Sequence, residues 1–218
     1  MSVKAVLFDC DGVIVDSEEI GVGHIRDELA ELGLEMSREE VVALFVGKTL
    51  PGVGGVLREA GHPVPEDWHR GVYDRLYARL AAGTPLVDGI EDVLDALDAA
   101  GIAYAVGSNG EIAKMQITLP QHPAVWARVK NQLHSGQALG APKPDPAVYL
   151  HAAKALGFAP EACVVVDDSP SGCKAGVAGG FRTLGYASGL HSADELSAVG
   201  AETFTEMSAL LALIGIAG

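Results

Sequence analysis

Residues 3–18 read VKAVLFDCDGVIVDSE, and this stretch decides how the rest of the sequence is interpreted. Val3 to Phe8 is almost entirely apolar and rich in β-branched residues, which predicts a short strand buried on both faces. Asp9 and Asp11 follow directly, and the period of an extended chain places both side chains on one side. Gly12 then allows a sharp turn. The stretch therefore predicts two carboxylates at the carboxyl end of a buried strand.

Two crowded carboxylates repel each other unless a cation or a shared proton relieves the repulsion. Asp9 and Asp11 are consistent with a hard-metal site such as one for Mg²⁺, whose preferred ligands are oxygen atoms. A polar strand end followed by an Asp-Gly turn accounts for the same residues without a metal. Residues 9–12 alone leave both interpretations open.

The composition indicates a globular protein. The 218 residues are 49% hydrophobic and 20% charged, and the formal net charge of −14 argues against a nucleic-acid or anionic-membrane surface, which needs a basic stripe. The longest apolar run, near residues 209–217, is too short to span a bilayer. Because the first predicted strand begins at residue 3 and leaves no room for a signal peptide, we expect a cytoplasmic protein.

Cysteine and histidine patterns indicate neither a disulfide framework nor a zinc site. Cys10, Cys163 and Cys173 lack a Cys-x-x-Cys spacing, so we interpret them as small buried apolar residues. The seven histidines are scattered without a ligand-like spacing. The usual nucleophile-elbow, Walker-type and dinucleotide-binding motifs are also missing from the sequence.

Residues 17–82 show helical periodicity throughout, including a capping box formed by Ser37 and Glu40. Because this block lies between two regions that contain strands, we predict an all-helical cap domain inserted into a core made of residues 1–16 and 83–218. The two crossings between core and cap are the natural hinges.

After the cap, short apolar strands alternate with helices. Strands are expected at residues 102–107, 132–134, 163–166 and 181–185. This alternation predicts an α/β fold with a Rossmann-like, doubly wound parallel sheet. Ligands of such sheets bind at the carboxyl ends of the strands, where the strand order reverses.

Polar residues follow the predicted strands at this same edge. Ser108 and Asn109 follow one strand, Asp167 and Asp168 follow another, and Lys143 lies in a loop before a helix. Each residue by itself can be explained as a helix cap or a loop residue. Their convergence on one edge favours a single functional site.

These residues resemble the motifs of haloacid dehalogenase superfamily hydrolases that have a helical cap inserted after the first strand. The matching motifs follow the family's order and spacing over nearly the whole chain: Asp9-x-Asp11-Gly12, Ser108-Asn109, Lys143-Pro144-x-Pro146 and Val166-Asp167-Asp168-Ser169-x-x-Gly172. The resemblance implies a Mg²⁺-dependent phosphatase with a small-molecule phosphate ester as its substrate.

The resemblance also implies a role for each residue. Asp9 would attack phosphorus to form an aspartyl-phosphate, and Asp11 would protonate the leaving group and later take a proton from water. Mg²⁺ would be held by Asp9, the backbone carbonyl of Asp11 and Asp168, with Asp167 assisting directly or through water. Phosphate would be bound by a further set of residues: Lys143, Ser108, Asn109 and Gly110.

The cap carries a narrower resemblance. Residues 45–49 are similar to the loop that touches substrate in β-phosphoglucomutase-like members, so Lys48 is a candidate for binding a sugar carboxylate or hydroxyl, although a solvated lysine explains it equally well. Gly21 stands where the mutases carry a cap histidine, which weakens that interpretation. Residues 114–116 and 143–153 look most like bacterial phosphatases that act on 6-phosphogluconate.

We therefore expect a phosphatase of small phosphorylated metabolites, with sugar or sugar-acid phosphates as the expected substrates. The protein is expected to be a monomer or a weak homodimer. One alternative is a phosphosugar mutase. Another is a non-catalytic ligand-binding protein on the same fold, although such a protein would need neither a nucleophile at Asp9 nor a proton shuttle at Asp11.

Overall fold

The computed structural model describes residues 2–45 and 50–216. The chain forms two compact units. The first, called the core here, comprises Met1–Asp16 and Pro85–Gly218, and the second, called the cap, comprises Ser17–Thr84. The cap is therefore a single insertion between two segments of the core.

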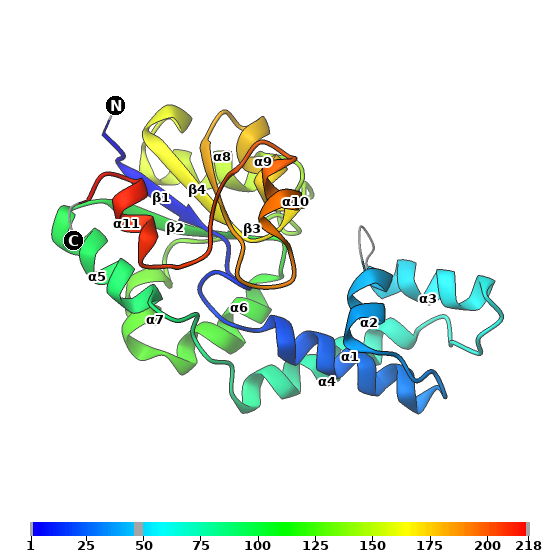
Figure 1. Cartoon of the computed structure of the whole chain (residues 1–218). Helices are drawn as coiled ribbons and strands as arrows, with labels where there is room; N and C mark the ends of the chain where they lie inside the picture. The colour runs from blue at the N-terminus through cyan, green and yellow to red at the C-terminus, as the bar shows by residue number, and fades with distance from the viewer. Residues whose placement is uncertain (1, 46–49, 217–218) are drawn as a thin grey trace. The chain divides into compact units, whose positions relative to one another are not determined.

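The core contains a six-stranded sheet in which every neighbouring pair is parallel (Figure 1). The strand order is β3-β2-β1-β4-β5-β6, so the order reverses beside β1. The strands are β1 (Ala5–Phe8), β2 (Ala103–Ser108), β3 (Leu133–Ser135), β4 (Cys163–Asp167), β5 (Arg182–Tyr186) and β6 (Glu202–Phe204). This topology confirms the predicted Rossmann-like fold class.

Helices cover both faces of this sheet, because alternate residues of the buried strands point to opposite sides. Val6 and Phe8 of β1 pack in one apolar cluster with residues of α5, α6, α7 and α11. Ala5 and Leu7 pack in another, with residues of α8 and α9. The core helices are α5 (Ile90–Ala100), α6 (Ile112–Thr118), η1 (Leu119–Gln121), α7 (Pro123–Val129), α8 (Ala147–Leu156), η2 (Pro160–Ala162), α9 (Pro170–Ala178), α10 (Ala193–Ser197) and α11 (Ala209–Leu213).

The last part of the core adds elements that the sequence analysis did not predict. They are α10, β6 and α11, of which β6 has only three residues. Such short elements carry too few residues for a periodic pattern to emerge. Strand β6 nevertheless completes the sheet by pairing with β5, from Leu184 opposite Glu202 to Tyr186 opposite Phe204.

Within residues 17–45 and 50–84, the cap forms four helices around its own apolar cluster. Ile25 and Leu29 of the first helix pack with Val53, Leu57 and Val72 of later helices. The Ser37 and Glu40 capping box is present: each backbone N–H donates to the other residue's side chain, at 2.8 and 3.2 Å. The cap helices are α1 (Glu18–Glu31), α2 (Arg38–Phe45), α3 (Leu50–Glu59) and α4 (Trp68–Ala82).

The core segments that lead into and out of the cap are paired with each other. The backbone N–H of Asp16 donates to the carbonyl oxygen of Pro85 at 2.9 Å, and the N–H of Val87 donates to that of Ile14 at 3.0 Å. These bonds fix the ends of both crossings within the core. Within the part of the chain that the structure describes, no helix is both long enough and apolar enough to cross a membrane.

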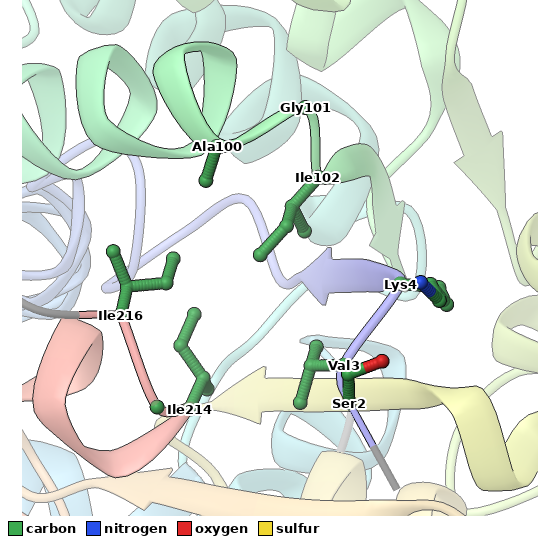
Figure 2. A pocket seen from close by; sticks show the side chains of 9 residues that line it. Ser2, Val3, Lys4, Ala100, Gly101, Ile102, Ile214 and Ile216 are labelled. Carbon is green, nitrogen blue, oxygen red and sulfur yellow. The ribbon is translucent and has the colours of Figure 1, made fainter.

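A hollow of about 480 Å³ lies at the amino-terminal edge of the sheet (Figure 2). Its lining includes Val3 and Lys4, which precede β1, and Gly101 and Ile102, which precede β2. Ligands of parallel sheets bind at the opposite, carboxyl edge. The hollow is therefore distinct from the site built by the strand ends.

Candidate active site

Three neighbouring strands end in polar residues at the carboxyl edge of the core sheet. Asp9 follows β1, Ser108 ends β2 and Asp167 ends β4. The backbone N–H of Asp9 donates to the carbonyl oxygen of Val166 at 2.9 Å, which extends the pairing of β1 with β4 by one residue. Because Phe8 pairs with Val166, the next residues of the two strands, Asp9 and Asp167, lie beside each other.

A lysine joins these two carboxylates. The Nζ atom of Lys143 lies 2.6 Å from Oδ1 of Asp9 and 2.7 Å from Oδ2 of Asp167. The side chains of Lys143 and Asp167 are buried, and that of Asp9 is only 11% exposed. Since a buried charge without a partner is very costly, each of these groups depends on the other two.

The carboxylate of Asp167 accepts four hydrogen bonds. Its Oδ2 receives them from Nζ of Lys143 and from Oη of Tyr149, at 2.7 and 2.5 Å. Its Oδ1 receives them from the backbone N–H and the Oγ of Ser169, at 2.9 and 2.8 Å. Four donors account for roughly all the lone-pair positions of a carboxylate.

Asp168 completes a group of three acidic side chains. Asp9, Asp167 and Asp168 each offer a carboxylate oxygen, and these oxygens lie within 4.8 Å of one another. All three residues are buried. Oxygen ligands suit a hard divalent cation. Three carboxylate oxygens at this spacing therefore fit such a cation.

Two glycines leave room for these acidic side chains. Gly12 has a φ of +74°, and a Cβ atom there would lie only 2.1 Å from Oδ2 of Asp168. A Cβ atom at Gly172 would lie 1.7 Å from Oδ2 of Asp167. Both positions therefore require glycine.

The charge of the site shifts the pKa values of its members. Burial, reinforced by Asp167 and Asp11 and opposed by Lys143, raises the pKa of Asp9 to about 7. Burial would also raise the pKa of Asp167, but Lys143 and the other donors hold it below its usual value. The pKa of Lys143 is raised, since its two carboxylates outweigh the effect of burial. Lys143 therefore stays an ammonium.

Asp11 makes a separate ion pair. Its Oδ1 lies 2.8 Å from Nζ of Lys114, which comes from α6, and both side chains are partly exposed. A Cβ atom at Gly110 would lie 3.8 Å from Oδ2 of Asp11, so the loop after β2 passes close to this carboxylate. Asp11 is thus held at the more accessible side of the cluster.

The loop after β2 is fastened to the loop that carries Lys143. The side-chain amide of Asn109 accepts a hydrogen bond from the backbone N–H of Lys143 at 2.7 Å and donates one to its carbonyl oxygen at 3.2 Å. The Oγ of Ser108 accepts one from the N–H of Gly110 at 2.9 Å. Asn109 therefore fixes the backbone from which the Lys143 side chain projects.

The residues predicted from the sequence fall into three groups. Asp9, Lys143, Asp167 and Asp168 form one buried cluster, and Ser108, Asn109, Gly110 and Asp11 belong to the loops described above. Lys48, the predicted cap contact, lies outside the described residues.

Contacts made by two further residues were not anticipated. Tyr149 donates to Asp167, and Lys114 pairs with Asp11. A tyrosine on the otherwise apolar face of α8 was an available signal for the first, because a buried hydroxyl needs a partner. Lys114 gave no comparable signal, since a lysine in the first turn of a helix is usually solvated.

The comparisons with known proteins agree with this geometry. A family model described as haloacid dehalogenase-like hydrolase matches residues 3–180. The match spans both units of the chain and all four motifs identified in the sequence. The chain therefore belongs to the haloacid dehalogenase-like hydrolases, and the resemblance seen in the sequence is confirmed.

Two of the similar proteins are named as phosphatases. The chain is 32% identical over 191 residues to 6-phosphogluconate phosphatase from Escherichia coli K12, covering 87% of this chain and 85% of the relative. It is 29% identical over 188 residues to hexitol phosphatase A from the same strain, covering 84% and 83%. A member of this family with such relatives is a phosphoric monoester hydrolase.

A solved structure matches almost the whole fold. A haloacid dehalogenase family hydrolase from Deinococcus radiodurans R1, solved with bound phosphate and sodium, has a TM-score of 0.84 and 32% sequence identity. The match covers 98% of this chain and 96% of that one. The similarity thus includes both the parallel sheet and the helical cap.

Proposed function

We propose that this enzyme hydrolyses phosphate monoesters of small sugars or sugar acids with Asp9 as the nucleophile. The observation that carries this proposal is the cluster of Asp9, Lys143, Asp167 and Asp168 at the carboxyl ends of neighbouring strands. It combines a carboxylate nucleophile with a fixed cation and with acidic side chains close enough together to hold a metal ion. Phosphoryl transfer depends mainly on such positioning and electrostatic stabilisation.

In the first step, a carboxylate oxygen of Asp9 forms a bond to phosphorus while the bond from phosphorus to the leaving oxygen breaks. Asp11, in its protonated form, gives its proton to that leaving oxygen. The products are a free alcohol and an aspartyl-phosphate on Asp9. Lys143, which contacts Asp9 at 2.6 Å, neutralises part of the charge that gathers at the phosphoryl group.

In the second step, water attacks the phosphorus of the aspartyl-phosphate. Asp11, now a carboxylate, takes the proton from that water, and the bond between phosphorus and the Asp9 oxygen breaks. Inorganic phosphate leaves, and both residues return to their starting forms. Lys114 pairs with Asp11 at 2.8 Å and keeps the carboxylate in place for this proton transfer.

Mg²⁺ is the cation that best suits this site, because its ligands would be carboxylate and carbonyl oxygens. Asp9, Asp168 and the backbone carbonyl of Asp11 would hold it. Asp167 would act indirectly, since its oxygens already accept four hydrogen bonds. The ion supplies positive charge that lets an anionic nucleophile meet an anionic ester.

The loop after β2 would bind the transferring phosphoryl group. The hydroxyl of Ser108 and the backbone N–H of Asn109 are the proposed donors, because they lie at the end of the strand next to Asp9, whereas the N–H of Gly110 already donates to Ser108. The side chain of Asn109 contributes differently: it holds the backbone of Lys143, so it positions that cation. Such preorganised donors are worth most where water is excluded.

Sugar-acid and sugar-alcohol phosphates are the proposed substrates because two relatives are named for 6-phosphogluconate and for hexitol phosphates. The net charge of −14 means that the site's own lysines must attract such anions. Contact between Lys48 and the substrate stays a prediction. So do the cytoplasmic location, the lack of nucleic-acid and membrane partners, and the monomeric or weakly dimeric state.

The test is phosphate release by the pure protein with Mg²⁺, measured across 6-phosphogluconate, hexitol phosphates, hexose phosphates, phosphoglycolate and an aryl phosphate. We expect turnover of at least one sugar or sugar-acid phosphate. Asp9→Asn, which keeps the size of the side chain, should lower kcat by at least about 10³-fold. Undiminished release by Asp9→Asn would show that another group is the nucleophile.

The mutase alternative makes a different prediction with the same protein. Incubation with a hexose 1-phosphate and a hexose bisphosphate primer would yield a hexose 6-phosphate from a mutase. We expect free phosphate instead, because Gly21 occupies the position of the cap histidine in the mutases. The non-catalytic alternative is set aside by membership of the hydrolase family with phosphatase relatives.

A further inference from the structure

Lys143 is shared by two carboxylates that compete for it. Its Nζ lies 2.6 Å from Asp9 and 2.7 Å from Asp167, so neither carboxylate is clearly favoured by distance. Under the proposed function, the lysine is useful only while it remains beside Asp9. A group that weakens the attraction of Asp167 would therefore favour the productive position.

Tyr149 is placed to have this effect. It lies in α8 and is completely buried, and its hydroxyl donates to Oδ2 of Asp167 at 2.5 Å. This is the same oxygen that accepts from Lys143. A second donor on one oxygen takes up part of its negative charge, which leaves less for the lysine.

The ring of Tyr149 makes an independent contact with the lysine. The Nζ atom of Lys143 lies 4.6 Å from the ring centroid, within the range of a cation–π interaction. The ring supports the ammonium from one side while the hydroxyl acts on its competing partner. One side chain thus touches both the cation and the carboxylate that would draw it away from Asp9.

We propose that Tyr149 is a positioning residue for the hydrolase reaction, holding the Lys143 ammonium beside Asp9 through its hydroxyl on Asp167 and through its ring. This inference rests on the roles proposed above for Asp9 and Lys143. In this proposal Asp167 is the second counter-ion of Lys143, and Tyr149 sets how strongly Asp167 attracts the lysine.

The surrounding structure fixes the tyrosine in this orientation. A Cβ atom at Gly107 of β2 would lie 3.0 Å from the Tyr149 ring, so the glycine leaves the space that the ring occupies. On another side the ring of Phe181 packs edge-on, with the centroids 6.4 Å apart. The hydroxyl therefore reaches Asp167 from a rigid support, as a positioning role requires.

Tyr149→Phe is the decisive variant because it removes the hydroxyl and keeps the ring. Freed of the competing donor, Asp167 should draw Lys143 away from Asp9. We expect kcat for an aryl phosphate or the best sugar phosphate to fall about tenfold, the effect of losing one hydrogen bond to a charged group. KM should change less than about twofold, since the substrate-binding donors are untouched.

Phe158→Leu is the matched control. It removes an aromatic ring that packs against the same apolar cluster as Tyr149 and leaves Tyr149 and its contact with Phe181 in place, so it should lower the melting temperature and keep kcat within about twofold of the wild type. The inference is wrong if Tyr149→Phe keeps the wild-type kcat, or if the two variants lose kcat equally. Loss of activity in Asp9→Asn together with full activity in Tyr149→Phe would reject this inference and leave the proposed function standing.

Discussion

The core and the cap each contain a buried carboxylate paired with a basic side chain, and the two arrangements differ in charge balance. In the cap, Glu28 of α1 is 5% exposed and pairs with Arg75 of α4, whose side chain is 53% exposed. In the core, Lys143 is 3% exposed and faces the buried carboxylates of Asp9 and Asp167, with Asp168 beside them.

The difference separates a structural ion pair in the cap from the proposed active site in the core. In the cap, the charge of the Glu28 carboxylate is balanced by the Arg75 guanidinium, which also reaches solvent. The pair therefore requires no bound ion. In the core, the ammonium of Lys143 is shared by two buried carboxylates, with the carboxylate of Asp168 close to both, and burial keeps water away from them. Such crowding of like charges opposes folding, whereas the proposed cation would relieve it.

Replacing the basic residue of each region, Lys143 in the core and Arg75 in the cap, should give the largest difference in kcat and in unfolding free energy. Lys143→Met keeps the aliphatic stem and leaves the buried carboxylates unbalanced, so kcat should fall by about 10²–10³-fold. The unfolding free energy should also fall, by about 3–5 kcal/mol without divalent cations, because an uncompensated charge is left buried. Steady-state kinetics and urea denaturation measure the two effects.

Arg75→Met is the matched change in the cap. Its half-exposed guanidinium is partly hydrated, so its loss should cost about 1–2 kcal/mol and leave kcat within about twofold. Equal losses of kcat in the Lys143 and Arg75 variants would remove the distinction drawn between the two regions.

The increase in melting temperature on cation binding should give the next largest difference between core and cap variants. Mg²⁺ at about 100 times its dissociation constant should stabilise the wild type by about 2.7 kcal/mol, which raises the melting temperature by about 5–10 °C for a chain of this size. Asp168→Asn removes one of the proposed ligands and should reduce this shift to below about 2 °C. Thermal denaturation with and without MgCl₂, at constant ionic strength, measures it.

The Mg²⁺ shift should survive changes in the cap. Arg75→Met is expected to keep the full increase in melting temperature, since Arg75 lies in α4 of the cap and is not one of the proposed ligands. A full shift in Asp168→Asn would mean that the cation binds elsewhere.

The fold was predictable where patterns were long or strongly apolar. Strands β1, β2, β4 and β5 lie within two residues of the expected bounds, because their apolar runs are set by the burial that they undergo. The short elements near the end of the core, β6 among them, escaped prediction. Their positions depend on pairing with β5, which no local pattern encodes.

The residues of the candidate site could be predicted from the sequence, but the hydrogen bonds between them could not. Asp9 and Asp168 were identified because charged residues that follow the strands of a parallel sheet gather at the edge where ligands bind, and Lys143 was identified as a loop residue in a motif that resembles the family's. The two hydrogen bonds between the side chain of Asn109 and the backbone of Lys143 join residues 34 positions apart. The hydrogen bond that Tyr149 donates to Asp167 likewise depends on how α8 packs on the sheet. Such contacts follow from tertiary packing, so sequence spacing alone could not predict them.

The smallest expected effect concerns the cap carboxylate and its pH dependence. Hydrogen bonds from Arg75 to Glu28, at 2.6 and 2.5 Å, lower the pKa of that carboxyl below its usual value, against the effect of burial. A group with a lowered folded-state pKa contributes stability above its unfolded pKa of about 4.3, and this contribution is lost as the pH falls through the folded value. Glu28→Gln should therefore cost about 1–2 kcal/mol at pH 7, with kcat within about twofold.

Below the folded pKa of Glu28, the wild type and Glu28→Gln should converge in unfolding free energy, because both then carry a neutral side chain. Denaturation at pH 7, 5 and 3 measures this convergence. Glu19→Gln is the matched control in the same helix: Glu19 pairs with Arg38, but it is 61% exposed, so its loss should cost no more than about 0.5 kcal/mol. A difference between wild type and Glu28→Gln that stayed constant over this pH range would mean that the carboxylate charge is not what stabilises the cap. The cap pair would then resemble the core cluster in holding a charge that folding does not need.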